Sequence, residues 1–132
     1  SDLLWFNLSH SGDDIAMLIS DEGEVGCDIE VIRPRENWQA LANAVFSLTE
    51  HDELEREAPE EQLSAFWRIW TRKEAIVKQR GGSAWQIVSI DSTAQSLPVS
   101  QLRFGSLSLA VCTPTPFTLT AESVTYSGIS AA

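Results

Sequence analysis

The chain has 132 residues, of which 43% are hydrophobic, and it carries a formal net charge of −10. This length fits one domain with its own core, spanning residues 1–132, and the hydrophobic content excludes a disordered chain. The acidic balance argues against a nucleic-acid partner, which needs a basic face, and the absence of a run of about 18 apolar residues argues against a membrane span.

The first third of the chain has the pattern of three strands. Leu3–Ser9 and Ile15–Ser20 are apolar runs separated by a glycine-containing turn. Val25–Ile32 alternates regularly and ends before Pro34. Because strand side chains alternate, this pattern places Val25, Cys27 and Ile29 on one face and Gly26, Asp28 and Glu30 on the other.

The middle of the chain is predicted to be helical. Glu36–Phe46 has apolar residues at helical spacing, and the capping box that starts at Ser47 predicts a second helix. Pro59 suits the first turn of a longer helix, which we expect to run from Glu60 to Arg80 and to end at the following glycine pair. Its predicted core stripe is Leu63, Phe66, Trp67, Ile69, Trp70, Ile76 and Val77.

The last third is predicted to be antiparallel β structure, separated by turns at glycine and proline residues. The element order therefore predicts an α+β fold in which an antiparallel sheet packs against the long helix. The strand candidates are Gln86–Ile90, Gln101–Phe104, Ser106–Thr113 and Phe117–Thr125.

Two observations bear on compartment and completeness. Cys27 and Cys112 lie in strand-like apolar surroundings, which is typical of buried thiols in a cytosolic protein and not of a disulfide framework. The first residues have no basic region or apolar core of the kind found in signal peptides, so we expect a cytoplasmic protein. Since the chain opens with Ser1 and not Met, we also expect part of the natural protein to be absent.

Asp28 and Glu30 are the first candidates for chemistry. They lie two residues apart on the third strand, so their carboxylates point the same way beside Gly26, which has no side chain to crowd a ligand. Paired carboxylates suit Mg²⁺, which binds one or two of them together with phosphate oxygens and water. The alternative interpretation is a solvated strand face.

The long helix carries a second group of candidates. Glu74 and Lys78 are four residues apart, and so lie on one face of the helix, in line with tryptophans. They form either a surface ion pair or part of a binding site. The local excess of positive charge favours a small anionic ligand or an acidic partner. Five of the nine basic residues lie in this region: Arg68, Arg72, Lys73, Lys78 and Arg80.

Ser9 and His10 stand where the first strand enters its turn. Hydroxyls, turn amides and an imidazole can together bind phosphate oxygens, although a turn satisfied by local hydrogen bonds is the simpler interpretation. A serine hydrolase is disfavoured because adjacent residues rarely meet as nucleophile and base and because no Gly-x-Ser-x-Gly motif is present.

Taken in order, four segments resemble the 4′-phosphopantetheinyl transferases. The resemblance is to the larger type with two similar halves, and especially to the short holo-acyl-carrier-protein synthases of enterobacteria. It extends over about residues 4–90, and the G-x-D-x-E and W-x-x-K-E-x-x-x-K motifs together are highly specific. The segments are Phe6–Gly12 (FNLSHSG), Gly26–Glu30 (GCDIE), Phe46–Glu50 (FSLTE) and Phe66–Lys78 (FWRIWTRKEAIVK).

The resemblance implies a role for each matching residue. Asp28, Glu30 and Glu74 match the carboxylates that bind Mg²⁺ in the family. Lys78 matches a lysine near the phosphates and the reacting hydroxyl, and Lys73 a neighbour that contacts phosphate or carboxylate. Ser9 and His10 match a segment that contacts the phosphates of coenzyme A, and Glu50 matches a carboxylate proposed as general base.

The implied reaction moves the 4′-phosphopantetheine group of coenzyme A to a serine of an acyl or peptidyl carrier protein, leaving adenosine 3′,5′-bisphosphate. The chain matches the end of the family's first half and the whole second half, and it has no match to the basic residues for the 3′-phosphate that the first half supplies. A homo-oligomer could supply part of the missing wall. Two alternatives stay open: a truncated homologue that binds coenzyme A or carrier protein without transfer, and an unrelated Mg²⁺-dependent phosphohydrolase.

Overall fold

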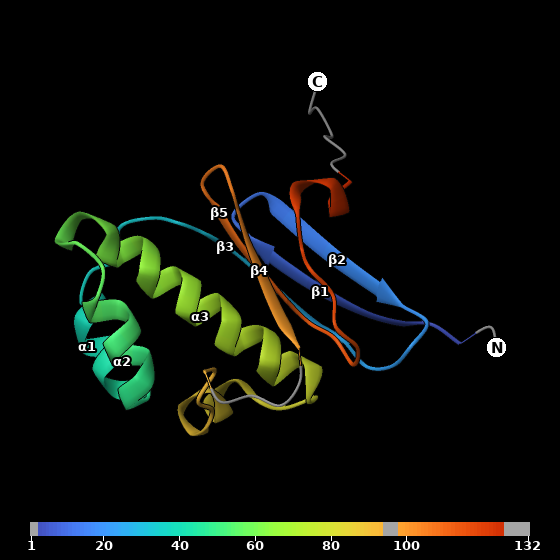
Figure 1. Cartoon of the computed structure of the whole chain (residues 1–132), viewed down its shortest axis with the longest axis horizontal. Coiled ribbons are helices and arrows are strands. Elements are labelled where there is room, and N and C mark those ends of the chain that lie inside the picture. The colour runs from blue at the N-terminus through green and yellow to red at the C-terminus, as the bar shows by residue number, and fades with distance from the viewer. Residues whose placement is uncertain (1–2, 94–97, 126–132) are drawn as a thin grey trace.

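The computed structural model describes residues 3–93 and 98–125, which form two antiparallel sheets and one long helix (Figure 1). Strands β1 (Trp5–Ser11) and β2 (Asp14–Ser20) form a two-stranded hairpin around a turn at Gly12, whose φ is 58°. A second sheet has the order β3-β5-β4. Its antiparallel strands are β3 (Gly26–Val31), β4 (Val99–Phe104) and β5 (Leu107–Cys112).

The helices begin and end close to the predicted positions. They are α1 (Trp38–Val45), α2 (Leu48–Glu55) and α3 (Gln62–Gln79). The predicted capping box is present at α2, where Ser47 and Glu50 satisfy each other's backbone amides. A 3₁₀ turn at Pro59–Glu61 leads into α3, and the left-handed Gly81 follows its end. Within the described residues, none of these helices has the length and apolar character that crossing a bilayer requires.

Two of the predicted strands are wrong. Gln86–Ile90 lies mostly in a 3₁₀ helix, Ala84–Ser89, which is stabilised by a capping box between Ser83 and Gln86. The described residues of Phe117–Thr125 form no strand, because the Leu119 amide donates to the Ser100 hydroxyl at 2.7 Å and a 3₁₀ turn follows at Ala121–Ser123. Local side-chain caps therefore replace the backbone ladders that the apolar patterns had suggested.

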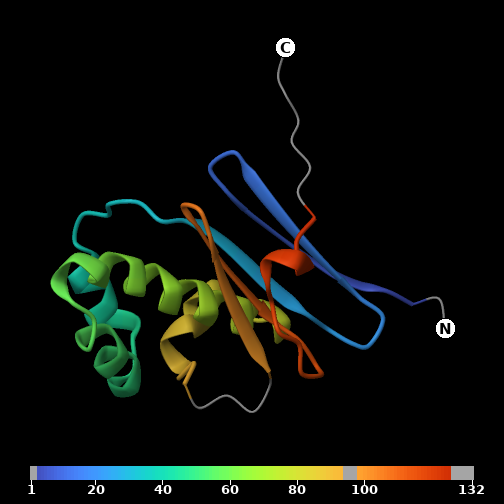
Figure 2. The same ribbon diagram turned by 45° about the horizontal axis from the view of Figure 1, so that its top comes forward.

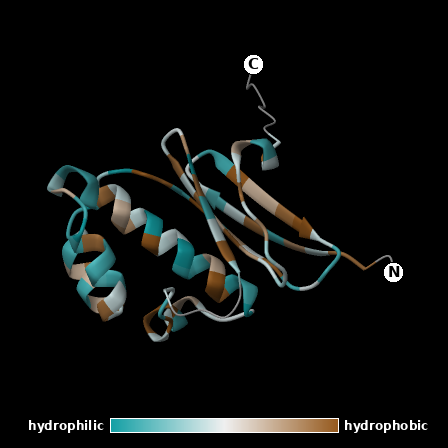
Figure 3. Ribbon diagram, in the orientation of Figure 1, coloured by the Kyte–Doolittle hydropathy of each residue, from teal (hydrophilic) through white to brown (hydrophobic). Residues whose placement is uncertain are grey.

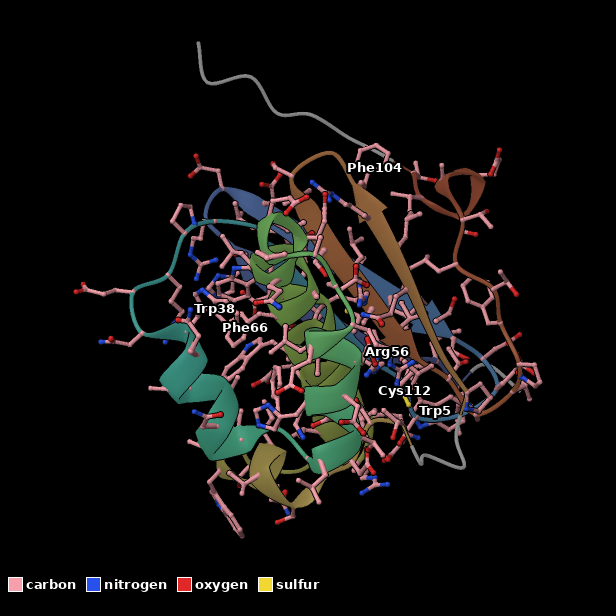
Figure 4. All side chains as sticks on the ribbon, turned by 60° about the vertical axis from the view of Figure 1, so that its left-hand side comes forward. Trp5, Trp38, Arg56, Phe66, Phe104 and Cys112 are labelled. Atoms are coloured by element: carbon pink, nitrogen blue, oxygen red, sulfur yellow. The ribbon has the colours of Figure 1, made fainter. Side chains whose placement is uncertain are left out.

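The main core lies between α3 and the three-stranded sheet, which confirms the predicted α+β architecture. Most of the predicted stripe of α3 is buried, while Leu63 and Trp70 pack against it from partly exposed positions. Figure 4 shows Trp38 beside Phe66, with ring centroids 5.6 Å apart. The structure also confirms that both cysteines are free and buried.

The β1–β2 hairpin has an apolar outer face. Its polar side chains Asn7, Ser9 and Ser11 point toward β3, and Leu18 packs against the small core around Cys27. The other large apolar side chains from Phe6 to Ile19 point outward. Figure 3 shows the hydrophobic colouring of β2. The hairpin therefore exposes a large apolar surface, whereas an antiparallel sheet usually turns its apolar face toward the core. The outer face consists of Phe6, Leu8, Ile15, Met17 and Ile19, each at least 53% exposed.

Candidate functional site

Strand β3 lies between the β1–β2 hairpin and helix α3 (Figures 1 and 2). The predicted alternation of its side chains is confirmed, since Gly26 and Asp28 meet α3 while Cys27 packs into a second small core on the other face. The carboxylate of Asp28 is consequently enclosed and not solvated, with 4% of the residue exposed. The solvated-face interpretation of this strand therefore does not hold for Asp28.

Gly26 sets the distance between β3 and α3. A Cβ atom at this position would lie 2.1 Å from the carbonyl oxygen of Ala75 and 2.4 Å from the amide nitrogen of Gln79. Both atoms belong to the helix backbone, so they could not move aside without moving the helix. The glycine thus permits the close contact that brings Glu74 and Lys78 of α3 to the carboxylates of β3.

The two oxygens of Asp28 differ sharply in their partners. Oδ1 accepts hydrogen bonds from the Lys78 ammonium at 3.0 Å and from the Ser9 hydroxyl at 3.1 Å. Oδ2 is buried and has no hydrogen-bond partner among the described residues. A buried carboxylate oxygen without a partner is costly unless a ligand completes it, so this atom marks the site as one that binds something.

Glu30 and Glu74 add negative potential at the same place. Burial, followed by the charge of Asp28, raises the pKa of Glu30 to about 8. The same two causes raise the pKa of Glu74, and burial also raises the pKa of Asp28, which Lys78 opposes. Among residues 3–93 and 98–125, however, no three His, Cys, Asp or Glu side chains come together closely enough to hold a metal ion. The three carboxylates interact electrostatically, and the ligand set stays a prediction.

The predicted phosphate-binding pair separates onto two faces of the hairpin. Ser9 is buried against β3 and donates to Asp28, whereas His10 is exposed on the outer face, opposite Ile15 in the ladder. Adjacent residues of a strand point to opposite sides, so Ser9 and His10 do not converge on one ligand from β1.

Glu50 and Lys73 lie outside the site, paired with each other in the interior. Lys73 donates to Oε1 of Glu50 at 2.8 Å and to the carbonyl of Ile90, and the two side chains have no exposed surface. The second carboxylate oxygen of Glu50 accepts from the amide and hydroxyl of Ser92. This arrangement argues against Glu50 as a general base and against Lys73 as a phosphate contact, because both groups are fully buried and hydrogen-bonded to protein partners.

The basic stretch of α3 is also neutralised by the protein. Arg68 pairs with Glu53 and Glu57, and Arg72 pairs with Glu53 at 2.8 Å. Of the predicted basic cluster, Lys78 is the residue that reaches the β3 carboxylates. Arg68 and Arg72 are therefore paired within the protein, and the anionic ligand or acidic partner expected for this stretch stays a prediction.

Two residues that attach the hairpin to β3 could not be identified from the sequence. Asn7 and Ser11 accept hydrogen bonds from the amides of Cys27 and Val31, each at 3.1 Å. Polar residues at every second position of β1 were a visible signal, but nothing local to β1 indicates which strand they face.

Carboxylates gathered beside a lysine at a strand–helix contact are typical of proteins that bind a divalent cation together with a phosphate-bearing ligand. A model of the 4′-phosphopantetheinyl transferase superfamily matches residues 24–125. The chain belongs to this superfamily, as its sequence motifs had indicated.

Its relatives carry the same description. The chain is 78% identical over 123 residues to "4′-phosphopantetheinyl transferase AcpT" of Salmonella typhimurium, a match that covers 92% of this chain and 64% of the relative. It is 75% identical over 124 residues to the protein of the same name in Escherichia coli, covering 93% and 64%. A "4′-phosphopantetheinyl transferase" of Bacillus subtilis is 37% identical over 76 residues, covering 58% and 33%. The chain thus spans a little less than two thirds of the length of the first two relatives.

Proposed function

We propose that this chain carries the metal-binding part of an enzyme that transfers 4′-phosphopantetheine from coenzyme A to a serine of a carrier protein. The observation that supports it most strongly is Asp28, whose Oδ2 is buried without a partner next to Lys78. Membership of the superfamily implies this reaction, and the chain spans 64% of the length of the Salmonella relative.

The oxygen donors at this place suit a divalent cation in their chemistry, and a bound ion would draw the three carboxylates closer together than they lie in the described part of the chain. Among the described residues, Asp28 has one oxygen without a hydrogen-bond partner. The charge of Asp28, after burial, raises the pKa of both Glu30 and Glu74, as like charges do at close range. We propose that Asp28, Glu30 and Glu74 hold Mg²⁺, which when bound would neutralise charge on the pyrophosphate.

Lys78 would act directly on the transferred phosphate. Its ammonium lies at Asp28, where it can donate to a phosphate oxygen of coenzyme A as negative charge builds up there. In the transfer, a bond forms from the carrier serine oxygen to the β-phosphorus and the bond to the bridging oxygen breaks. The serine proton is released, and adenosine 3′,5′-bisphosphate leaves. The buried Glu50–Lys73 pair would support this site by holding α2 and Ser92 against α3.

The expected partners and cellular location follow from this function. Coenzyme A and an acyl or peptidyl carrier protein would be the partners, and His10 could meet them only from the exposed outer face. A cytoplasmic location agrees with two free, buried thiols. The second candidate, a homologue that binds without transfer, is favoured only by the length of the chain, since the metal-site residues are retained.

The proposal is tested by incubating the chain with coenzyme A, Mg²⁺ and apo carrier protein and measuring the carrier by intact mass. We expect an increment of one phosphopantetheine, absent with chelator and with Glu74→Gln. Carrier binding without an increment would select the non-catalytic homologue. Phosphate release without any carrier would select a phosphohydrolase. The Salmonella relative serves as positive control.

A further inference from the structure

Strands β1 and β3 are joined by side chains and not by a backbone ladder. From Asn7 to Ser11, every second side chain of β1 accepts a hydrogen bond from a backbone amide of β3. Asn7 accepts from Cys27 at 3.1 Å, Ser9 from Ile29 at 3.0 Å and Ser11 from Val31 at 3.1 Å. The two strands belong to different sheets. The edge of β3 that does not pair with β5 is therefore satisfied by side chains of the hairpin.

Ser9, the middle residue of this series, has a second interaction. A serine hydroxyl that accepts from an amide still has its own proton to donate, and Ser9 donates it to Oδ1 of Asp28 at 3.1 Å. Ser9 is itself 5% exposed, so solvent does not compete strongly for this proton. Within the described part of the chain, neither Asn7 nor Ser11 hydrogen-bonds to Asp28, although each accepts from a β3 amide as Ser9 does.

We propose that Ser9 is a positioning residue for the Asp28 carboxylate. By engaging Oδ1 together with Lys78, it holds the carboxylate in the orientation that leaves Oδ2 for the ligand. This role differs from the phosphate contact expected for Ser9, because both hydrogen-bonding functions of its hydroxyl are already committed within the protein. The inference rests on the proposed function in so far as Asp28 is taken to bind the metal.

The chain offers a matched control. Ser9→Ala and Ser11→Ala each remove a hydroxyl that accepts a hydrogen bond from one backbone amide of β3. Of the two, Ser9→Ala alone also removes the hydrogen bond to Asp28. Both variants should therefore lower the denaturation midpoint, with Ser9→Ala lowering it at least as much because it removes one hydrogen bond more. Ser9→Thr keeps the hydroxyl, and a β-branched residue suits a strand.

Two measurements on the 132-residue chain test the proposal. The first is the χ1 distribution of Asp28 without metal, from three-bond couplings in NMR: we expect a single rotamer in the unaltered chain, Ser9→Thr and Ser11→Ala, and averaging in Ser9→Ala. The second is Mg²⁺ affinity by calorimetry. Loss of a hydrogen bond to a metal ligand typically lowers affinity by roughly 10–100-fold, which we expect for Ser9→Ala, against less than about threefold for Ser11→Ala.

Each outcome decides a different claim. Equal loss of affinity in Ser9→Ala and Ser11→Ala, or no recovery in Ser9→Thr, would reduce Ser9 to a link between strands and overturn the inference. If the unaltered chain binds no Mg²⁺, the metal site of the proposed function fails, and the rotamer measurement alone decides the role of Ser9. An Asp28 side chain that keeps one rotamer in Ser9→Ala, or is already averaged in the unaltered chain, would then overturn it.

Discussion

The Lys73 ammonium lies 2.8 Å from Oε1 of Glu50, and neither side chain is exposed to solvent. The two residues come from different helices, α3 and α2, and Glu50 also binds Ser92 beyond the 3₁₀ helix. The pair thus connects three segments in the interior. Removing either side chain would leave the charge of its partner buried without a counterion.

Lys73→Met should therefore destabilise the fold. Breaking a buried ion pair typically costs about 3–5 kcal/mol, since the remaining charge is uncompensated. We expect a loss of this size in urea denaturation of Lys73→Met. Lys78→Met is the comparison: it leaves the buried Asp28 without its cation, but the pKa of that carboxyl is already raised by burial, so the group can take up a proton and the loss should be smaller. A Lys73→Met chain of unchanged stability that lost coenzyme A binding would show instead that Lys73 contacts the ligand.

Lys78→Ala should affect turnover much more than binding. Its positive charge acts on negative charge that grows in the transition state, and removing one such donor typically lowers turnover by about 10²–10³-fold. We expect this loss in an active form, such as the matching position of the Salmonella relative, with only a few-fold change in coenzyme A affinity. Single-turnover kinetics with calorimetry separate the two quantities. A large loss of affinity with unchanged turnover is the contrary result.

Coenzyme A should bind this chain weakly compared with the full-length Salmonella relative. The chain has no match to the family residues expected to hold the 3′-phosphate. Each missing charge-assisted hydrogen bond costs about 1.5–3 kcal/mol, so losing two lowers affinity by roughly two to four orders of magnitude. Calorimetry on both proteins in Mg²⁺ measures the difference. Equal affinity for the monomeric chain would mean that these residues form a sufficient site.

The metal-free chain should lose stability as the pH rises from about 5 to 8. Burial and the Asp28 charge raise the pKa of Glu30 from 4.5 to about 8, so the folded state binds this proton more tightly than the unfolded state. Its stabilising contribution is complete below pH 4.5 and is lost as the pH passes 8. Asp28 and Glu74 have raised pKa values and act in the same direction. Denaturation at several pH values should show a shallower slope in Glu30→Gln, and a stability that rises over this range would contradict the assignment.

The outer face of the hairpin should make the isolated chain self-associate. Its five large apolar side chains carry no charge, on a chain whose net charge is otherwise −10. A second copy can cover the face by stacking the same surface against itself. Sedimentation velocity should show a concentration-dependent dimer, and Leu8→Lys with Met17→Lys should restore the monomer. Altering exposed Leu48, on α2, to lysine is the control. A monomer at all concentrations would exclude this contact.

Much of the fold could be predicted because its signals are local. Strand alternation correctly placed Gly26 and Asp28 on one face, and the capping box at Ser47 correctly placed the start of α2. The same periodicity could also have separated Ser9 from His10, since neighbours on a strand face opposite sides. The motif match identified the superfamily for the same reason, because it depends on residue order alone.

Contacts between segments that are distant in sequence decide which charged groups remain available to a ligand. Lys73 and Lys78 are similar lysines on one helix, yet Lys73 is enclosed because Glu50 arrives from α2, while Lys78 meets Asp28 of β3. Ser9 became a partner of Asp28 only when the hairpin docked against β3, 19 residues away. Burial and pairing are properties of the packed chain, since a charged group settles where its desolvation is offset by partners that local sequence does not reveal.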